Sequence, residues 1–172
     1  MKLKHLALLF IAAVPLMGFD CITDSFVIAL DMKPFNGTYN ITPGNNPNYG
    51  GSITIDPGTL YDTAYELTGA SVYDIRVSTA GPNLGNCSGA VTVNGVLLMT
   101  YNGTWTQFNT PQSLLTSRLI TRNNSGVTEL VNAVVQNRPV VLAVNGSVTT
   151  TPVPNGCSLT VSAYVQAYGH LR

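Results

Sequence analysis

The chain has 172 residues, with eight lysines and arginines against eight aspartates and glutamates, so its formal net charge is zero. Only 9% of the residues are charged, while 45% are hydrophobic. This apolar content is too high for a disordered chain, and the lack of clustered Lys and Arg argues against nucleic acid as a partner. We therefore expect one folded domain with a surface made mainly of uncharged polar side chains.

The first residues have the layout of a secretory signal peptide. Two lysines precede a nearly continuous apolar run from Leu6 to Leu16, and small or neutral residues follow it. The run is too short to span a bilayer, which takes roughly 20 apolar residues. We expect a signal peptide over residues 1–18, extending at most to residue 20, and a single β-rich domain over residues 19–172. The protein is then exported, to the periplasm, outer membrane or surface of a bacterium.

Three cysteines, Cys21, Cys87 and Cys157, leave one thiol over after pairing. The simplest disulfide joins Cys87 to Cys157 and closes about 70 residues, worth roughly 4 kcal/mol in the chain-entropy model. Cys21 then stands where a bacterial lipoprotein carries its lipid, although Phe19 and Asp20 replace the small residue expected before it. Three alternatives stay open for Cys21: a lipid anchor, a disulfide, and a free or intermolecular thiol.

The mature chain begins with a strictly alternating segment that ends at Pro34. Alternation of this kind is typical of a half-buried strand. Such a terminal strand docks in its own domain or completes the sheet of a neighbour. Its apolar face is the candidate strand-exchange segment, formed by Phe26, Ile28, Leu30 and Met32.

Further strands are predicted over residues 37–42, 50–56 and 70–79, with Tyr73, Ile75 and Val77 on one face of the last. The pair Asn94-Gly95 separates two β-prone runs, the pattern of a hairpin with a type I′ turn.

The last third of the chain predicts two more strands, over residues 139–150 and 157–169, joined by a turn with two prolines and a glycine. Asn145-Gly146 interrupts the first of them and predicts a bulge or a second tight turn. In the second, one face is shared by Leu159, Val161, Ala163, Val165 and Ala167.

Two helices are predicted between these hairpins. Residues 125–139 carry valines and leucines at helical spacing, with Ser125 as the cap and Pro139 as the stop. Residues 110–120 predict a shorter helix, capped by Thr110. Together the elements predict a mainly β fold: a single antiparallel β-sandwich-like domain of about eight strands, with one or two short helices before the C-terminal hairpin.

Residues that carry most enzyme chemistry are scarce. The sequence has two histidines, His5 in the predicted signal peptide and His170 near the last residue. That leaves little for a Ser–His–acid triad, a histidine metal site or a base beside a cysteine nucleophile. We predict no enzymatic activity, no catalytic or metal-ligating residue and no cofactor.

Four carboxylates lie close together in the sequence: Asp56, Asp62, Glu66 and Asp74. Paired carboxylates can hydrolyse glycosides, and oxygen-rich clusters can bind calcium. The simpler interpretation is that Asp56-Pro57-Gly58 forms a turn and that the other carboxylates face solvent.

Residues 100–109 place Tyr101, Trp105 and Phe108 on one short stretch. Aromatic rings stack on sugar faces in many β-sandwich modules, but a single tryptophan in a small domain is also a common core residue. These three aromatics are therefore candidate contacts for a glycan or a partner.

The sequence thus predicts a non-enzymatic, exported cell-envelope protein with a structural or assembly role, as a surface or membrane-tethered subunit. Its expected partners are other envelope proteins or further copies of itself, and a membrane through a lipid on Cys21, but not nucleic acid. The alternative is a glycan- or partner-binding module outside the cytoplasm that uses the Trp105 region.

Overall fold

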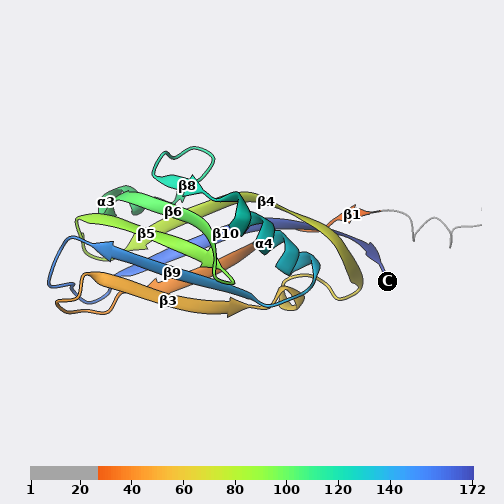
Figure 1. The fold of residues 1–172 in the computed structure, drawn as a ribbon, viewed down its shortest axis with the longest axis horizontal. Coiled ribbons are helices and arrows are strands. Elements are labelled where there is room, and N and C mark those ends of the chain that lie inside the picture. Colours follow the sequence, from red (N-terminus) through yellow and green to blue (C-terminus); the bar gives the residue numbers. More distant parts are fainter. Residues whose placement is uncertain (1–26) are drawn as a thin grey trace, which may run out of the picture.

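Two antiparallel β-sheets pack face to face in the computed structural model, which describes residues 27–172 (Figure 1). In the first sheet, β10 (Ser158–Leu171) is flanked on one side by β1 (Ile28–Ala29) and β2 (Lys33–Asn40), and on the other by β4 (Tyr65–Ala80) and then β7 (Gln112–Ser113). The second sheet has the order β3 (Asn48–Ile55), β9 (Val140–Val148), β5 (Asn86–Val93), β6 (Val96–Thr104) and β8 (Ile120–Arg122).

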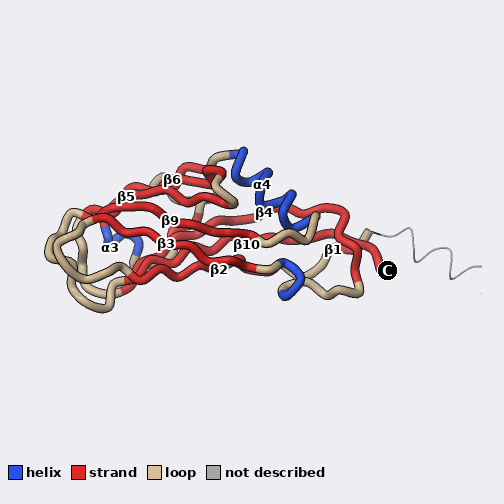
Figure 2. The backbone as a smooth tube through the Cα atoms, turned by 60° about the horizontal axis from the view of Figure 1, so that its bottom comes forward, coloured by secondary structure: helices blue, strands red, loops and turns tan. Residues whose placement is uncertain are grey.

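These ten strands confirm the predicted mainly β, sandwich-like fold, with two strands more than expected. Three short helical segments complete it: the 3₁₀-helix η2 (Pro57–Thr59), α3 (Trp105–Phe108) and α4 (Asn124–Val135). In Figure 2, α3 lies near one end of the sandwich, while α4 lies toward the opposite end, where β10 finishes. No helix within residues 27–172 combines the length and apolarity that a membrane span requires.

The core lies between the sheets and is filled by the inward faces of the strands. On β10 the alternation predicted from the sequence is confirmed, because every second residue is fully buried. The buried set is Leu159, Val161, Ala163, Val165 and Ala167.

The predicted type I′ hairpin joins β5 to β6. Asn94 and Gly95 have φ angles of 49° and 82°, the left-handed values that such a turn needs at both positions. The Asn94 side chain also ties the turn to its neighbours. Its Nδ2 donates to Glu129 Oε1 on α4 at 2.9 Å, and its Oδ1 accepts from the backbone N–H of Val141 on β9 at 2.8 Å.

The longer predicted helix is confirmed as α4, although its cap differs. Asn123, two residues before the predicted Ser125, caps the helix by accepting the backbone N–H of Ser125 at 2.9 Å. The buried face contains Val127, Leu130 and Val134, as the spacing predicted.

Gly126 brings the first turn of α4 against the backbone of β6. A Cβ at this position would overlap the backbone atoms of Leu97 and Leu98. We expect Gly126→Ala to lower the free energy of unfolding by about 2 kcal/mol, since overpacking of 1–3 kcal/mol outweighs the better helix propensity of alanine. Urea denaturation measures this change.

Thr128→Ala, on the exposed face of the same helix, is the matched control and should leave the stability almost unchanged. A Gly126→Ala variant as stable as the wild type would contradict the close approach.

Three local predictions are wrong. Residues 110–120 form no helix but β7 and a turn, in which Ser113 pairs with Arg76 of β4 and donates its hydroxyl to Asp74 at 2.8 Å. Pro34 does not end a strand but lies within β2, an edge strand, where a residue without an N–H is tolerated.

The predicted bulge or turn at Asn145-Gly146 is also absent, because β9 pairs in unbroken register through both residues. Gly146 serves close packing here. A Cβ on it would lie 2.6 Å from the carbonyl oxygen of Ser88 and from Cζ of Tyr49.

A β-bulge changes the expected faces of β4. The register between β4 and β10 shifts at Tyr73, so that Asp74 pairs with Tyr164 while Val72 pairs with Val165. Tyr73 therefore points to solvent, whereas Ile75 and Val77 on the same predicted face are fully buried.

Candidate functional site

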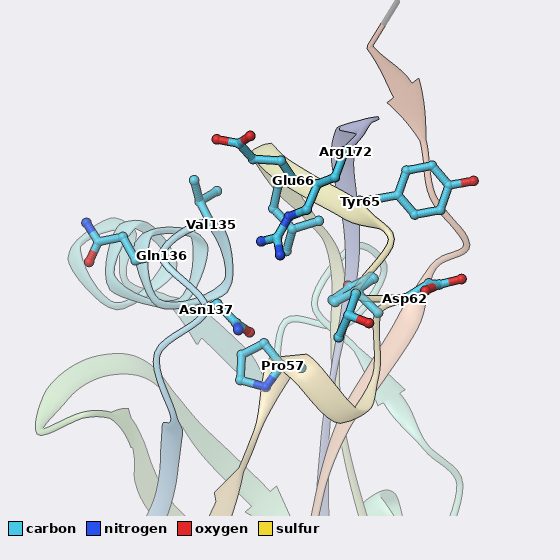
Figure 3. Close-up of a pocket in the computed structure, with 12 residues that line it drawn as sticks. Pro57, Asp62, Tyr65, Glu66, Val135, Gln136, Asn137 and Arg172 are labelled. Carbon is cyan, nitrogen blue, oxygen red and sulfur yellow. The ribbon is translucent and has the colours of Figure 1, made fainter. Parts of the chain in front are cut away.

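A pocket of about 270 Å³ opens at the end of the sandwich. Its walls come from η2, the start of β4, the C-terminal end of α4 and the end of β10 (Figure 3). Segments far apart in the sequence thus meet here, from Pro57 to Arg172.

The floor of this pocket is the turn predicted at Asp56-Pro57-Gly58. Asp56 caps η2, its Oδ1 accepting the backbone N–H of Gly58 at 2.9 Å. Asp62 fixes the next turn by accepting the N–H of Ala64 at 2.9 Å, and Ala64 in turn accepts the N–H of Arg172 at 2.9 Å. The loop is therefore held by two aspartate side chains and by the backbone of Arg172.

Tyr61 forms the wall between this pocket and the core. Its hydroxyl donates to the carbonyl oxygen of Val165 at 2.9 Å, and burial raises its pKa to about 12. At neutral pH it is therefore a fixed hydrogen-bond donor and not an acid–base group.

The charges around the pocket point in different directions. Arg172 and Asn137 point toward the space between η2 and α4, while the carboxylates of Glu66 and Asp62 point away from it (Figure 3). Glu66 lies 3.4 Å from His170 Nε2, and Arg172 makes no ion pair with any residue in the described range 27–172. The four carboxylates noted in the sequence do not form one cluster among the described residues. Asp74 instead accepts a hydrogen bond from Arg76 Nε at 2.7 Å.

A second cavity, of about 430 Å³, lies on the other side of the Tyr61–Tyr65 loop, against β1. Ile28, Leu30, Leu60 and Tyr61 give it apolar walls, and Asp31, Lys33 and Asp62 lie at its polar parts. Among residues 27–172, no group of three or more His, Cys, Asp or Glu side chains comes together to hold a metal ion.

The predicted strand-exchange segment borders this second cavity. β1 pairs with its own β10 at only two positions, Ile28 with Gly169 and Ala29 with Tyr168. The side chains of Ile28 and Met32 are 45% and 44% exposed, while Leu30 packs partly against the core. Phe26 lies outside the described residues, as do the predicted signal peptide and Cys21.

The predicted glycan contacts lie in the core instead. Trp105 and Phe108 are fully buried and Tyr101 is 2% exposed, so none of them presents a ring to a ligand in this structure. Tyr101 packs edge-to-face on Phe108, with ring centroids 6.0 Å apart, and its hydroxyl bonds to that of Tyr49 at 2.7 Å. The Trp105 region is therefore a packing cluster.

The predicted disulfide is not formed, and Cys87 and Cys157 are both free and buried. The two thiols contact different groups: Cys87 Sγ lies 3.2 Å from the Tyr49 hydroxyl, and Cys157 Sγ lies 3.8 Å from the carbonyl oxygen of Pro82. Cys87 lies in β5 of the second sheet, whereas Cys157 directly precedes β10 of the first. The two Sγ atoms therefore face different neighbours on different elements of the fold.

Sequence reasoning missed most of the residues that line the two cavities. The turn at Asp56-Pro57-Gly58 and the alternating segment with Ile28 and Leu30 did carry local signals. Asn137 carried a further one, since an Asn before a proline stop is a common helix end and its φ is the left-handed 50°. Arg172 and Leu60 carried no such signal, because only the fold brings them to the site.

No protein-family model matches the sequence, and no curated protein matches it. Two similar solved structures come from plant viruses. A chain of Desmodium yellow mottle tymovirus is 11% identical, with 83% of each chain covered and a TM-score of 0.34. A chain of turnip yellow mosaic virus is 17% identical, with 86% of this chain and 95% of that one covered and a TM-score of 0.35.

Both structures come from plant viruses and neither is a bacterial envelope protein, which contradicts several predictions. The predicted bacterial cell-envelope role, including the lipoprotein interpretation and the glycan- or partner-binding alternative, is corrected accordingly. Export through a signal peptide stays a prediction. The expected envelope, membrane and glycan partners and the exclusion of nucleic acid are corrected with it. At these TM-scores the likeness does not extend to function.

Proposed function

We propose that this chain is a non-enzymatic structural subunit that associates with further copies of itself. The observation that carries the proposal is the segment Val27–Met32 at the edge of the first sheet. Val27 is 61% exposed, and Ile28 and Met32 are nearly half exposed. Three large apolar side chains within one six-residue segment are therefore partly in contact with solvent.

Association would bury the side chains of Val27, Ile28 and Met32. Fully burying a Val, Ile or Met side chain is worth about 1.5–3 kcal/mol, so three half-exposed ones offer a few kcal/mol to an interface. The edge position adds a second reason, since β1 covers only two residues of β10 and an unpaired strand edge pairs readily with another chain. Exchange of this strand between copies stays a prediction, and in the structure β1 pairs with β10 of its own chain.

We expect the variant Val27→Ser, Ile28→Ser, Met32→Ser to associate at least tenfold more weakly than the wild type. Sedimentation velocity over a range of protein concentrations measures the difference. The three side chains contribute little to the core, so the fold should persist, as a circular dichroism spectrum checks.

Val141→Thr is the matched control, because Val141 is an exposed apolar residue on β9, in the other sheet. It should associate like the wild type. A wild-type protein that stays monomeric at every concentration would overturn the proposed function.

A further inference from the structure

The most exposed large apolar side chain of the described residues is Leu115, at 72%. It lies on the loop between β7 and β8, which projects from the sandwich above β8 in Figure 1. A lone exposed leucine needs no explanation. The surroundings of this one, however, set it apart.

The loop that carries Leu115 is fixed by its own hydrogen bonds. Ser113 organises it, since its hydroxyl accepts the N–H of Leu115 at 3.1 Å and its carbonyl oxygen accepts the N–H of Ser117 at 2.8 Å. Leu114 and Leu119 on either side pack against the core. Leu115 is thus held out in solvent by an ordered loop, and docking it would cost little conformational entropy.

Positive charge accompanies Leu115. Arg118 and Arg122 are both exposed, and neither forms an ion pair with any residue in the range 27–172. The loop and β8 therefore present one apolar side chain beside two uncompensated guanidinium groups.

The cavity beside β1 offers the complementary surface. Ile28, Leu30 and Leu60 line its apolar part. Of its charged lining residues, Asp31 pairs with Lys33 at 3.9 Å, whereas Asp62 makes no ion pair with a described residue. Its volume of about 430 Å³ exceeds the roughly 30 Å³ share of one water by more than tenfold, so it has room for a leucine side chain.

From this complementarity we propose that the loop Ser113–Arg122 of one copy docks into the cavity beside β1 of a second copy. Leu115 enters the apolar part, and Arg118 pairs with Asp62 at the edge. The inference rests on the proposed self-association and names its two surfaces.

The two surfaces differ and lie on separate parts of the molecule, the loop above β8 and the cavity beside β1 (Figure 1). Two copies that dock reciprocally about a two-fold axis form a closed dimer. Copies that dock head-to-tail each leave one cavity free and form rings or open chains.

Sedimentation velocity of four variants and the wild type tests this contact. Leu115→Ser, Arg118→Glu and Asp62→Arg should each weaken association at least tenfold relative to the wild type. The double variant Arg118→Glu, Asp62→Arg exchanges the two charges and should recover most of the association. Leu115 and Arg118 are exposed, so their variants should keep the wild-type melting temperature. Asp62→Arg also loses the contact with the Ala64 N–H, so its circular dichroism spectrum checks that it is still folded.

Mixing gives the sharpest outcome. Leu115→Ser keeps an intact cavity and Asp62→Arg keeps an intact loop, so an equimolar mixture should give a dimer and nothing larger. A mixture that stays monomeric, or single variants that associate like the wild type, would overturn the docking while leaving the proposed function standing. Dimers of Leu115→Ser alone would indicate exchange of β1 and would also overturn the docking proposal. A monomeric wild type would overturn both proposals.

Discussion

Replacing Trp105 with alanine is expected to lower the free energy of unfolding by about 4 kcal/mol. Truncation of a buried tryptophan or phenylalanine costs roughly 3–5 kcal/mol, because the lost burial is joined by the cost of a cavity. In a domain of this size the melting temperature should fall by roughly 8–16 °C. Thermal denaturation followed by circular dichroism measures it.

The size of this effect follows from where Trp105 sits. It begins α3 directly after β6, and its backbone N–H donates to the carbonyl oxygen of Gly85 at 2.7 Å. Its own carbonyl oxygen accepts the Thr79 hydroxyl of β4 at 2.9 Å. The residue therefore connects the two sheets near one end of the sandwich, with its ring fully buried between them.

The variant Trp105→Phe distinguishes the contribution of ring packing to stability from the cost of the buried indole Nε1. The indole Nε1 is buried without a hydrogen-bond partner among the described residues, and an unpaired buried donor costs about 1–3 kcal/mol. Phenylalanine removes that cost while keeping most of the apolar volume, so we expect a loss of about 1 kcal/mol or less. A phenylalanine variant as unstable as the alanine variant would contradict this account.

The burial of Trp105 could not be predicted from the periodicity of the sequence, whereas other features could. Alternation along the sequence correctly predicted the buried face of β10, and the pair Asn94-Gly95 correctly predicted a hairpin turn. Both features depend only on residues that are neighbours in the sequence. The exposure of an aromatic residue depends on which strands cover it. Sequence spacing therefore favoured a core position for Trp105 but did not exclude a ligand contact.

Elements decided by tertiary contacts were mispredicted for the same reason. Residues 110–120 have a helical pattern, but Gln112 donates its side-chain N–H to the carbonyl oxygens of Gln107 and Thr110, and Ser113 binds Asp74. Side chains that satisfy neighbouring groups in this way compete with helix formation.

Local patterns indicated single segments of the candidate site, but not how these segments come together. Its two cavities join the start of β4 to β1 on one side, and to the ends of α4 and β10 on the other. Leu115 was predicted to lie within a helix, and the loop that replaces that helix is what exposes it. The error in secondary structure therefore concealed the residue on which the docking proposal depends.

The second large effect is expected at alkaline pH, where the protein should lose stability steeply above about pH 10. Burial raises the pKa of both Tyr39 and Tyr61 from near 10 to about 12. Burial also raises the pKa of Tyr49 and Tyr101, whose hydroxyls share a hydrogen bond, and of the Cys87 thiol beside them. All of these groups are neutral in the folded protein at pH 7.

The sign follows from which state releases its protons first. A tyrosine in the unfolded chain titrates near pH 10, whereas folded Tyr39 and Tyr61 keep their protons to about pH 12. Between these values the unfolded state binds fewer protons, so stability is complete below pH 10 and is lost as the pH rises toward 12. Two units of pKa on each of two tyrosines amount to about 5 kcal/mol.

Urea denaturation at pH 8, 10 and 11 measures this loss, and single phenylalanine variants assign it. Tyr39 donates to the carbonyl oxygen of Leu142 at 2.7 Å and Tyr61 to that of Val165 at 2.9 Å. Tyr39→Phe and Tyr61→Phe should therefore each cost about 1 kcal/mol at pH 8. Above pH 10 each variant should also lose stability more slowly than the wild type, by up to about 1.4 kcal/mol per pH unit, since one titrating group has been removed. A wild-type stability that stays level to pH 11, or variants with the wild-type slope, would show that these hydroxyls reach solvent in the folded state.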